Sequence, residues 1–539
     1  MTTIHWIGLA VGLVFLNLSL TFTNIWPTLG IQPTGDLSVE LAVVALVLTL
    51  ARRWTETRSR WTLRWLSTVW VVLVLGRYAD VTARSLYGRD INLFWDLRHM
   101  PNVGAMFAAV ADPWLKIGII GGILVIPVVL YAASRWALTR LVVATFDARA
   151  RGVLGVTAGG VLLLGLAQGV GARTPVDLRF SEPVTPAYAE ELSELVYEMS
   201  GAGVRDLGPP QALSSDLSRV DGADVFVIFL ESYGMVSWDR PEFAAELVEA
   251  RTRFLADISE TGRSVVSARV ESTTFGGESW LAHISLLSGT EVRDPGTSKR
   301  LMGQDRDTLV KVFARQGYRT VAVMPGLQHA WPQGAFYGFE EIYDLGRLDY
   351  RGPPFGWWDL NDQFALARVD ALEIATRPRR PVFVFFPTVT THAPFVPTPP
   401  YQPDWARVLT PSPYDQADVD RAWLDHPDWL NLGPSYVKAL AYAYRTVGGY
   451  LRLRAERDLV LIVVGDHQPP ALVSGEGASW DVPVHVVASR PTVLDRLRQH
   501  RFVDGLSPSP SGARMDTLLP ILLDAFGTRD DADVIRALE

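Results

Sequence analysis

The sequence predicts an α/β protein in two parts, an N-terminal bundle of about five transmembrane helices and a globular α/β domain with a mainly parallel central sheet. Long apolar runs fill the first 173 of the 539 residues. Short apolar runs alternate with helical patterns after residue 224, and the proline-rich segment between these regions is typical of a linker. We therefore expect a transmembrane domain over 1–173, a linker over 174–223 and a globular domain over 224–539.

Five apolar runs are candidate membrane spans, since a helix needs about 20 residues to cross about 30 Å of hydrocarbon. The second run is the shortest and contains Glu40. A cleaved signal peptide would explain only the first run, because four more follow. The candidate spans are Ile4–Trp26, Leu37–Leu50, Leu63–Val81, Leu115–Trp136 and Gly152–Gly171.

The loops between the expected spans predict their orientation. Residues 24–36 contain no lysine or arginine, whereas residues 51–62 and 134–151 each contain four arginines. Positive loops favour the cytoplasmic side of a membrane. The pattern therefore predicts a multi-pass protein of the bacterial inner membrane, with everything after Gly171 on the extracytoplasmic, periplasmic side.

Composition excludes two classes of function. The formal net charge is −8 and there is no basic cluster, which argues against a nucleic-acid partner. The chain has no cysteine, so it has no disulfide, no thiolate nucleophile and no cysteine-ligated metal.

The second half contains apolar runs that are typical of strands buried on both faces of a sheet. Because helical patterns separate them, they predict a mainly parallel sheet in an α/β domain. Ligands bind such sheets beyond the carboxyl ends of the strands. The expected strands are Asp224–Ser232, Arg319–Pro325, Pro381–Thr388, Asp458–Asp466 and Val482–Ser489.

Acidic and imidazole groups follow two of these strands. Glu231 ends the first strand, and Asp466 and His467 end the fourth. Two carboxylates and one imidazole suit a divalent ion such as Mn²⁺ or Zn²⁺, and a hydroxyl beside such an ion can act as a nucleophile. From the residues alone, a glutamate at a strand end is more often a cap or an ion-pair partner, and "GDH" is often a simple turn.

Four short motifs extend this pattern: "FLESYG", "TTFGGES", "TTHAPF" and "VVGDHQPP". In this order they resemble the lipoteichoic acid synthase group of sulfatase-like phosphoglycerol transferases, in the alkaline phosphatase superfamily. The resemblance covers Asp224–Gly527 and implies a sulfatase-like fold for the globular domain. One departure is Tyr444, where many relatives carry an aspartate.

The resemblance also implies the roles of individual residues. The metal ligands would be Glu231, Thr274, Asp466 and His467, with Thr274 as the nucleophile and Thr273 in reserve. His392 would contact the substrate phosphate, and Trp331, with His329 as a further candidate, would line the substrate site. One divalent ion is implied, Mn²⁺ first, with Zn²⁺ or Mg²⁺ as alternatives.

The implied reaction moves a phosphoglycerol-type headgroup from a phosphatidylglycerol-like phospholipid to a hydroxyl of a glycan or polymer, through a phospho-threonine intermediate. A phosphoethanolamine transferase is one alternative, although such proteins usually carry disulfides and this chain has no cysteine. A phosphodiesterase of the same superfamily is another. A catalytically inactive membrane scaffold is the alternative from a different class.

Overall fold

A computed structural model describes residues 2–528, apart from 26–27, 52–59, scattered positions within 88–110, 170–178, 201–206, 208–212, 357 and 377–378. The chain divides into two compact units. We call residues 1–85 with 89–203 the helical unit, and residues 204–539 with 86–88 the C-terminal unit. Most of the arginines expected in the loop 51–62 lie outside the described residues.

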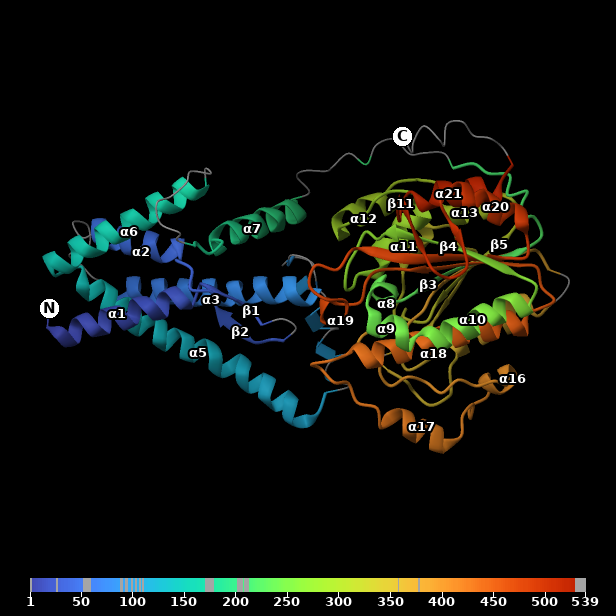
Figure 1. The fold of residues 1–539 in the computed structure, drawn as a ribbon, viewed down its shortest axis with the longest axis horizontal. Coiled ribbons are helices and arrows are strands. Elements are labelled where there is room, and N and C mark those ends of the chain that lie inside the picture. The colour runs from blue at the N-terminus through green and yellow to red at the C-terminus, as the bar shows by residue number, and fades with distance from the viewer. Residues whose placement is uncertain are drawn as a thin grey trace. The chain divides into compact units, whose positions relative to one another are not determined.

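Among its described residues, the helical unit has six helices and a small antiparallel sheet (Figure 1). Its elements are α1 (Thr3–Leu18), β1 (Phe22–Asn24), β2 (Ile31–Pro33), α2 (Val39–Leu50), α3 (Arg60–Tyr87), α5 (Pro113–Ala144), α6 (Ala148–Gly169) and α7 (Val184–Ser200).

Three of these helices, α3, α5 and α6, are long and apolar enough to cross a membrane. Helices α1 and α2 have 16 and 12 residues, which at about 1.5 Å per residue is too short for a hydrocarbon core of about 30 Å. The expectation of five full-length spans is therefore wrong for the described residues. The first expected span stops early because Asn17, Ser19 and Thr21 end its apolar run, and Thr21 Oγ1 bonds back to the Asn17 carbonyl at 3.0 Å.

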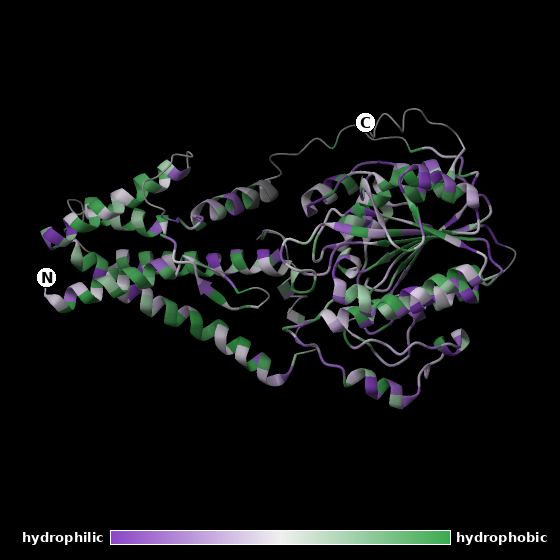
Figure 2. Ribbon diagram, in the orientation of Figure 1, coloured by the Kyte–Doolittle hydropathy of each residue, from purple (hydrophilic) through white to green (hydrophobic). Residues whose placement is uncertain are grey.

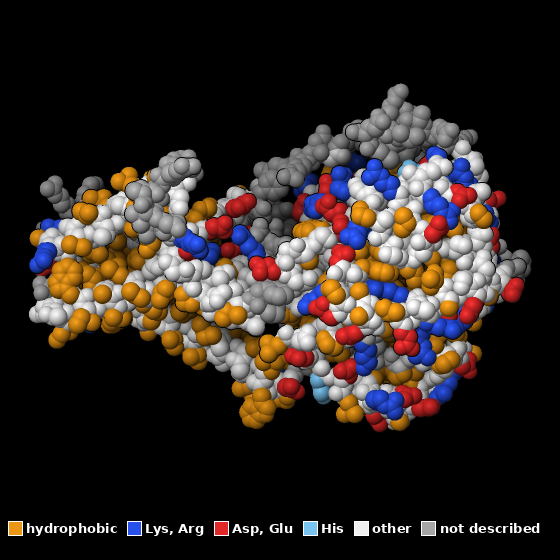
Figure 3. Space-filling model, viewed as in Figure 1, with side chains coloured by type: hydrophobic (Ala, Val, Ile, Leu, Met, Phe, Trp, Pro, Cys, Tyr) orange, Lys and Arg blue, Asp and Glu red, His pale blue; other side chains and the backbone are white. Residues whose placement is uncertain are grey.

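The two units differ in how apolar their exposed surfaces are. Figure 2 shows α5 as apolar along most of its length, and Ile123 and Leu124 on this helix are 67% and 66% exposed. On the C-terminal unit, exposed apolar side chains are interspersed with charged ones (Figure 3).

Helix α7 packs onto the other helices of its unit through two polar contacts. The buried Glu40 carboxylate of α2 accepts a hydrogen bond from the Val184 amide at 2.6 Å, at the first residue of α7. The Tyr188 hydroxyl donates to the Val72 carbonyl of α3 at 2.6 Å, and a side chain at Gly76 would collide with the Tyr188 ring. The glycine at position 76 is therefore required for this close approach.

The C-terminal unit is built on a nine-stranded mixed sheet in the order β10-β4-β9-β8-β3-β7-β5-β6, with β11 paired to β4. All five expected strands form, as β3, β5, β7, β8 and β9. The strands from β8 through β3, β7 and β5 to the edge strand β6 are parallel, but β9 and β10 run antiparallel to their neighbours. The expectation of a mainly parallel sheet holds for this centre and not for the β9–β4–β10 side.

The strands are β3 (Asp224–Leu230), β4 (Ser264–Glu271), β5 (Arg319–Met324), β6 (Glu341–Asp344), β7 (Val382–Pro387), β8 (Leu459–Gly465), β9 (Asp481–Ala488), β10 (Val503–Asp504) and β11 (Ser509–Arg514). The helices are α8 (Val236–Asp239), α9 (Pro241–Glu246), α10 (Val248–Glu260), α11 (Ser279–Ser288), α12 (Pro295–Met302), α13 (Leu309–Arg315), η2 (Pro332–Phe336), α14 (Leu345–Leu348), α15 (Asp362–Val369), η3 (Asp370–Ile374), α16 (Trp405–Val408), α17 (Gln416–Trp423), α18 (Gly433–Leu453), α19 (Ala471–Ser474), α20 (Pro491–Gln499) and α21 (Leu518–Phe526).

Two hydrophobic cores cover the two faces of the sheet. Alternate residues of β3 point to opposite faces: Val227 belongs to the core with α11, α13, α20 and α21, and Ile228 to the core with α10, α15 and α18. Figure 1 shows α11, α13, α20 and α21 on one side of the strands and α10 and α18 on the other. Because both faces are covered by helices, polar chemistry is confined to the ends of the strands.

Candidate metal centre

The central strands end side by side, which brings their following residues together. Leu230, the last residue of β3, pairs with Gly465, the last residue of β8. Glu231 therefore follows β3 at the point where Asp466 follows β8. On the other side of β3 lies β7, and the Glu231 amide donates to Thr388 Oγ1, just after β7, at 3.0 Å.

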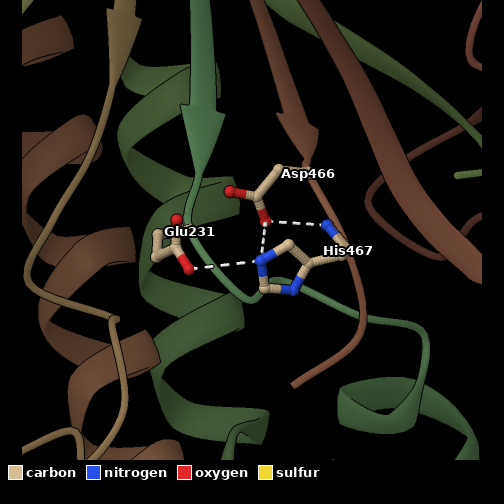
Figure 4. Close-up of side chains that lie close together, drawn as sticks. All are labelled: Glu231, Asp466 and His467. Atoms are coloured by element: carbon tan, nitrogen blue, oxygen red, sulfur yellow. Dashed lines mark hydrogen bonds and ion pairs between the residues drawn. The ribbon is translucent and has the colours of Figure 1, made fainter. Parts of the chain in front are cut away.

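Glu231, Asp466 and His467 form the candidate metal centre, and all three are buried (Figure 4). Among the described residues this is the one group of three such side chains whose ligand atoms lie within 4.8 Å of one another. His467 Nε2 is 3.3 Å from Glu231 Oε1 and 3.8 Å from Asp466 Oδ1. The structure thus brings together three of the four predicted ligands.

Local hydrogen bonds hold these groups in place. Asp466 Oδ1 accepts from the amides of Ser232 at 2.8 Å and His467 at 2.7 Å. His467 Nδ1–H donates to the Gln468 carbonyl at 2.7 Å, which leaves Nε2 facing the two carboxylates. The second oxygen of Asp466, Oδ2, is buried and has no hydrogen-bond partner among the described residues.

The electrostatics of the centre are those of two carboxylates crowded around one imidazole. Burial raises the pKa of Asp466 well above its usual value, and the adjacent Glu231 raises it further. Burial alone would lower the pKa of His467, but the Asp466 and Glu231 carboxylates raise it to about 9. Burial likewise opposes ionisation of Glu231, but the His467 imidazolium lowers its pKa below the usual range.

These features fit a divalent cation. A buried carboxylate oxygen without a partner costs free energy, and two neighbouring buried carboxylates repel each other. A cation relieves both costs. The donor set of two carboxylate oxygens and one imidazole nitrogen suits Mn²⁺ or Zn²⁺ better than Mg²⁺, which prefers oxygen ligands.

Two hydroxyls contact this centre. Ser232 Oγ donates to Glu231 Oε1 at 3.2 Å, whereas Ser279, a residue that the sequence reasoning missed, contacts both Glu231 and His467. Ser279 Oγ donates to Glu231 Oε2 at 2.7 Å and lies 3.3 Å from His467 Nε2. The hydroxyl of Thr274, the expected nucleophile, instead donates to the Gly277 carbonyl at 2.6 Å within its own turn. The geometry therefore replaces Thr274 with Ser279 as the candidate nucleophile.

The turn before Ser279 is fixed against the loop that follows β8. Ser272 Oγ donates to the Asp466 carbonyl, and the Gly276 amide donates to the Gln468 carbonyl at 3.1 Å. Gly276 has φ 68° and Glu278 has φ 58°, so the chain makes two left-handed steps before α11 begins at Ser279. These steps turn the chain so that the first residue of the helix, and not the threonine pair, meets Glu231.

Ser279 also occupies a favourable place for an anion. As the first residue of α11, a helix of ten residues, it lies at the positive end of the helix dipole. The first amide groups of a helix have no partner within the helix and are suited to bind phosphate. A phosphate that meets the Ser279 hydroxyl therefore also meets the start of α11.

His392, expected at the substrate phosphate, lies in the loop after β7. Its Nδ1 is 2.7 Å from the Ala393 carbonyl, its ring meets Trp358 edge to face at 5.8 Å, and its charged form lowers the pKa of Glu231. The structure therefore brings His392 within electrostatic reach of the centre.

Asp362 holds the loop that carries His392. Its two carboxylate oxygens accept from the amides of Val389 at 2.8 Å and Thr390 at 3.0 Å. Burial raises the pKa of Asp362 to about 6. This residue was not expected from the sequence, because its role depends on a loop 27 residues away.

The remaining expected residues have other contacts. Thr273 is buried, and its Oγ1 accepts from Ser285 Oγ at 3.3 Å. Trp331 packs against the core beside Tyr337, with ring centroids 5.4 Å apart, and His329 is exposed in the preceding loop.

Comparisons with known proteins find one matching family model. Residues 267–485 match the family model described as Sulfatase. No curated protein matches the sequence.

Several solved structures are similar in fold. The integral membrane lipooligosaccharide phosphoethanolamine transferase A from Neisseria meningitidis is 13% identical, with 97% of this chain and 98% of that chain covered and a TM-score of 0.49. The lipoteichoic acid synthase LtaP from Listeria monocytogenes is 12% identical, with 63% and 78% covered and a TM-score of 0.40. The phosphoglycerol transferase GacH from Streptococcus pyogenes is 10% identical, with 65% and 84% covered and a TM-score of 0.37.

The family model runs from within β4 to within β9 and so includes Ser279, His392, Asp466 and His467. Glu231, which follows β3, lies 36 residues before the matched segment. Strand order, site geometry and family match thus concern the same part of the chain. The C-terminal unit therefore contains a segment, residues 267–485, that matches the Sulfatase family model.

Proposed function

We propose that the protein is a membrane-anchored, metal-dependent transferase that moves a phosphoglycerol-type headgroup from a phospholipid to a hydroxyl of a glycan or polymer. The observation that carries the proposal is the contact of the Ser279 hydroxyl with both Glu231 and His467. Superfamily members are metal-dependent. Glu231, Asp466 and His467 would hold a divalent ion, which would lower the proton affinity of the neighbouring hydroxyl and neutralise charge on phosphate oxygens.

In the first step, Ser279 Oγ attacks the phosphorus of the headgroup. The Oγ–P bond forms and the bond from phosphorus to the diacylglycerol oxygen breaks. The Ser279 proton passes to Glu231, toward which the hydroxyl already points at 2.7 Å. His392, in its protonated form, gives a proton to the departing diacylglycerol oxygen.

In the second step, the acceptor hydroxyl attacks the phospho-serine. The new oxygen–phosphorus bond forms and the Oγ–P bond breaks. His392 takes the proton of the acceptor hydroxyl, and Glu231 returns its proton to Ser279. The amides at the start of α11 stabilise the charge that develops on the phosphate oxygens in both steps.

Three apolar helices favour a lipid donor, because an enzyme in the membrane shares a surface with its phospholipid. The predicted orientation puts the C-terminal unit on the extracytoplasmic side, where glycans and envelope polymers offer hydroxyl groups. The phosphoglycerol assignment rests on the motif resemblance, and a phosphoethanolamine headgroup presents the same phosphodiester to Ser279.

Diacylglycerol release from labelled phospholipids tests the proposal. Full-length protein with Mn²⁺ is assayed in vesicles of phosphatidylglycerol or of phosphatidylethanolamine, and the preferred donor identifies the headgroup. We expect Ser279→Ala to lower kcat by about 10⁴-fold or more, as removal of a nucleophile does.

Thr274→Ala is the matched control, five residues away in the same turn. We expect it to change kcat by less than about tenfold, because the Thr274 hydroxyl serves only the local turn. Wild-type turnover by folded Ser279→Ala protein would refute the assignment of the nucleophile. Absence of turnover with every phospholipid donor, in protein that holds its metal, would refute the transferase.

A further inference from the structure

Two buried polar atoms beside the candidate metal centre face each other. His283 Nε2 and Asp466 Oδ2 are 4.0 Å apart. Neither atom has a hydrogen-bond partner among the described residues. Native proteins rarely leave buried donors and acceptors unpaired, so two such atoms in one place require an explanation.

The position of His283 is set by helix periodicity and by aromatic packing. It follows Ser279 by four residues on α11, so both side chains lie on one face of the helix. Its ring packs against Phe229 of β3, with centroids 4.4 Å apart, and against Phe385 of β7 at 5.5 Å. These contacts fix the plane of the imidazole and leave its Nε2 edge toward Asp466.

The hydrogen bonds of Asp466 show what His283 can add. Oδ1 already accepts two amide hydrogens, from Ser232 and His467, which uses its two lone pairs. Oδ2 is therefore the oxygen available to a cation, and it has a second lone pair to fill. A carboxylate that binds a metal is usually held by a hydrogen bond from outside the ligand set.

We propose that His283 is a positioning residue of the metal centre, whose Nε2–H holds Asp466 Oδ2 in the orientation that binds the cation. The 4.0 Å separation is spanned by one water molecule, or closes to a direct hydrogen bond after a shift of about 1 Å. A neutral imidazole has one N–H donor, which Nε2 can supply to Asp466.

This role couples two parts of the centre. Ser279 and His283 lie on the same helix, and His283 reaches the ligand that follows β8. The inference therefore rests on the proposed metal-dependent function, and it adds that α11 positions a metal ligand as well as the nucleophile.

The experiment measures Mn²⁺ affinity by titration calorimetry on metal-depleted full-length protein, with thermal unfolding as the measure of folding. His283→Phe keeps an aromatic ring between Phe229 and Phe385 but removes the donor. His283→Gln removes the ring but keeps an N–H donor. We expect His283→Phe to raise the Kd for Mn²⁺ by about 10- to 100-fold, and His283→Gln to recover most of that loss.

His485 supplies the matched control. It is a second fully buried histidine in the same unit, with a pKa that burial lowers to about 3, but its ring bonds Tyr233 and Ser267. We expect His485→Phe to lower the unfolding temperature and leave the Kd for Mn²⁺ within about twofold of wild type, because its lost bonds are not to a metal ligand.

The outcomes separate this inference from the function on which it rests. Wild-type affinity in folded His283→Phe protein would overturn the positioning role and leave the metal centre intact. An equal loss of Mn²⁺ affinity in His283→Phe and His283→Gln protein would also overturn the positioning role. Packing of the ring, and not the N–H donor, would then be responsible for the loss. A wild-type protein that binds no stoichiometric Mn²⁺ or Zn²⁺ would overturn the metal centre itself.

Discussion

Each unit contains a buried carboxylate near the end of a helix or strand, Glu40 in the helical unit and Asp466 in the C-terminal unit. The two carboxylates differ in their hydrogen bonds. In the helical unit, Glu40 is 7% exposed. Its Oε1 accepts from the Val184 amide at 2.6 Å and from Thr185 Oγ1 at 3.3 Å, and its Oε2 accepts from Ser38 Oγ at 3.1 Å. Glu40 is a fully hydrogen-bonded cap at the start of α7, and its environment requires nothing more.

Asp466 in the C-terminal unit is 1% exposed, yet one of its oxygens lacks a hydrogen-bond partner and another carboxylate, Glu231, lies beside it. Burial is similar in the two places, so burial alone does not mark a functional acid. The difference lies in how the protein satisfies the charge. A saturated carboxylate stabilises the fold, whereas an unsaturated pair is preorganised for a ligand that supplies positive charge.

Metal binding should show the largest difference between Glu40 and the carboxylates of the candidate metal centre. Glu231→Gln keeps the shape of the side chain but removes one of two anionic ligands, so we expect the affinity for Mn²⁺ to fall by more than about 100-fold. Glu40→Gln should leave it unchanged. Titration calorimetry and metal content by mass spectrometry measure both, and equal affinities in the two variants would remove the distinction drawn above.

The pH dependence of metal binding should follow from His467. Its pKa is raised to about 9 without an ion, so the ring is protonated near neutral pH and must lose that proton to bind one. We expect the affinity for Mn²⁺ to rise by at least about tenfold per pH unit between about pH 7 and pH 9, with at least one proton released per ion. Calorimetry in buffers of different ionisation enthalpy counts the protons. A flat pH profile would mean that His467 is not a ligand.

Asp362 should affect catalysis without affecting the cation. Asp362→Asn keeps one acceptor and turns an N–H group toward an amide that it formerly accepted from, which loosens the loop that carries His392. We expect kcat/KM to fall by about tenfold, as the loss of one positioning contact does, with the Kd for Mn²⁺ unchanged. A change in metal affinity as large as that in kcat/KM would place Asp362 with the metal ligands instead.

The smallest effect should come from changing Glu40, whose carboxylate oxygens are both hydrogen-bonded. Glu40→Ala leaves the amide of Val184 and the hydroxyl of Thr185 without their acceptor, which costs about 1–3 kcal/mol of stability. Thermal unfolding in detergent measures the loss, and vesicle-reconstituted protein should retain its Mn²⁺ affinity. Loss of the ion in folded Glu40→Ala protein would show that the two carboxylates are not independent.

The sequence predicted the features that are marked by continuous apolar runs. Five buried strands were predictable because they are continuous apolar runs, and Glu231, Asp466 and His467 were predictable because they follow two of those runs. Strand β4 was missed because Ser267 and Arg269 interrupt its apolar pattern; Ser267 is buried there only because it bonds His485 across the sheet. The length of α1 was overestimated because the polar residues after Leu16 end the helix within an otherwise apolar stretch.

Sequence spacing alone could not show which hydroxyl group contacts Glu231. Thr274 and Ser279 are both close in sequence to Gly276 and Gly277, and the left-handed steps at Gly276 and Glu278 decide which of them meets Glu231. One signal was available: Ser279 directly precedes the apolar run Trp280–Leu287, the place of a helix start. His283 then follows at one helical turn, which is visible only once that helix is recognised.

The most direct test of the account is to locate the covalent phosphate. Protein incubated with phospholipid vesicles and no acceptor is digested, and fragment-ion mass spectrometry distinguishes Ser279 from Thr273 and Thr274 in the same peptide. The account predicts a substituted phosphate on Ser279 that disappears in Ser279→Ala and Glu231→Gln protein. A phosphate adduct on Thr274, or on Thr273, would contradict it.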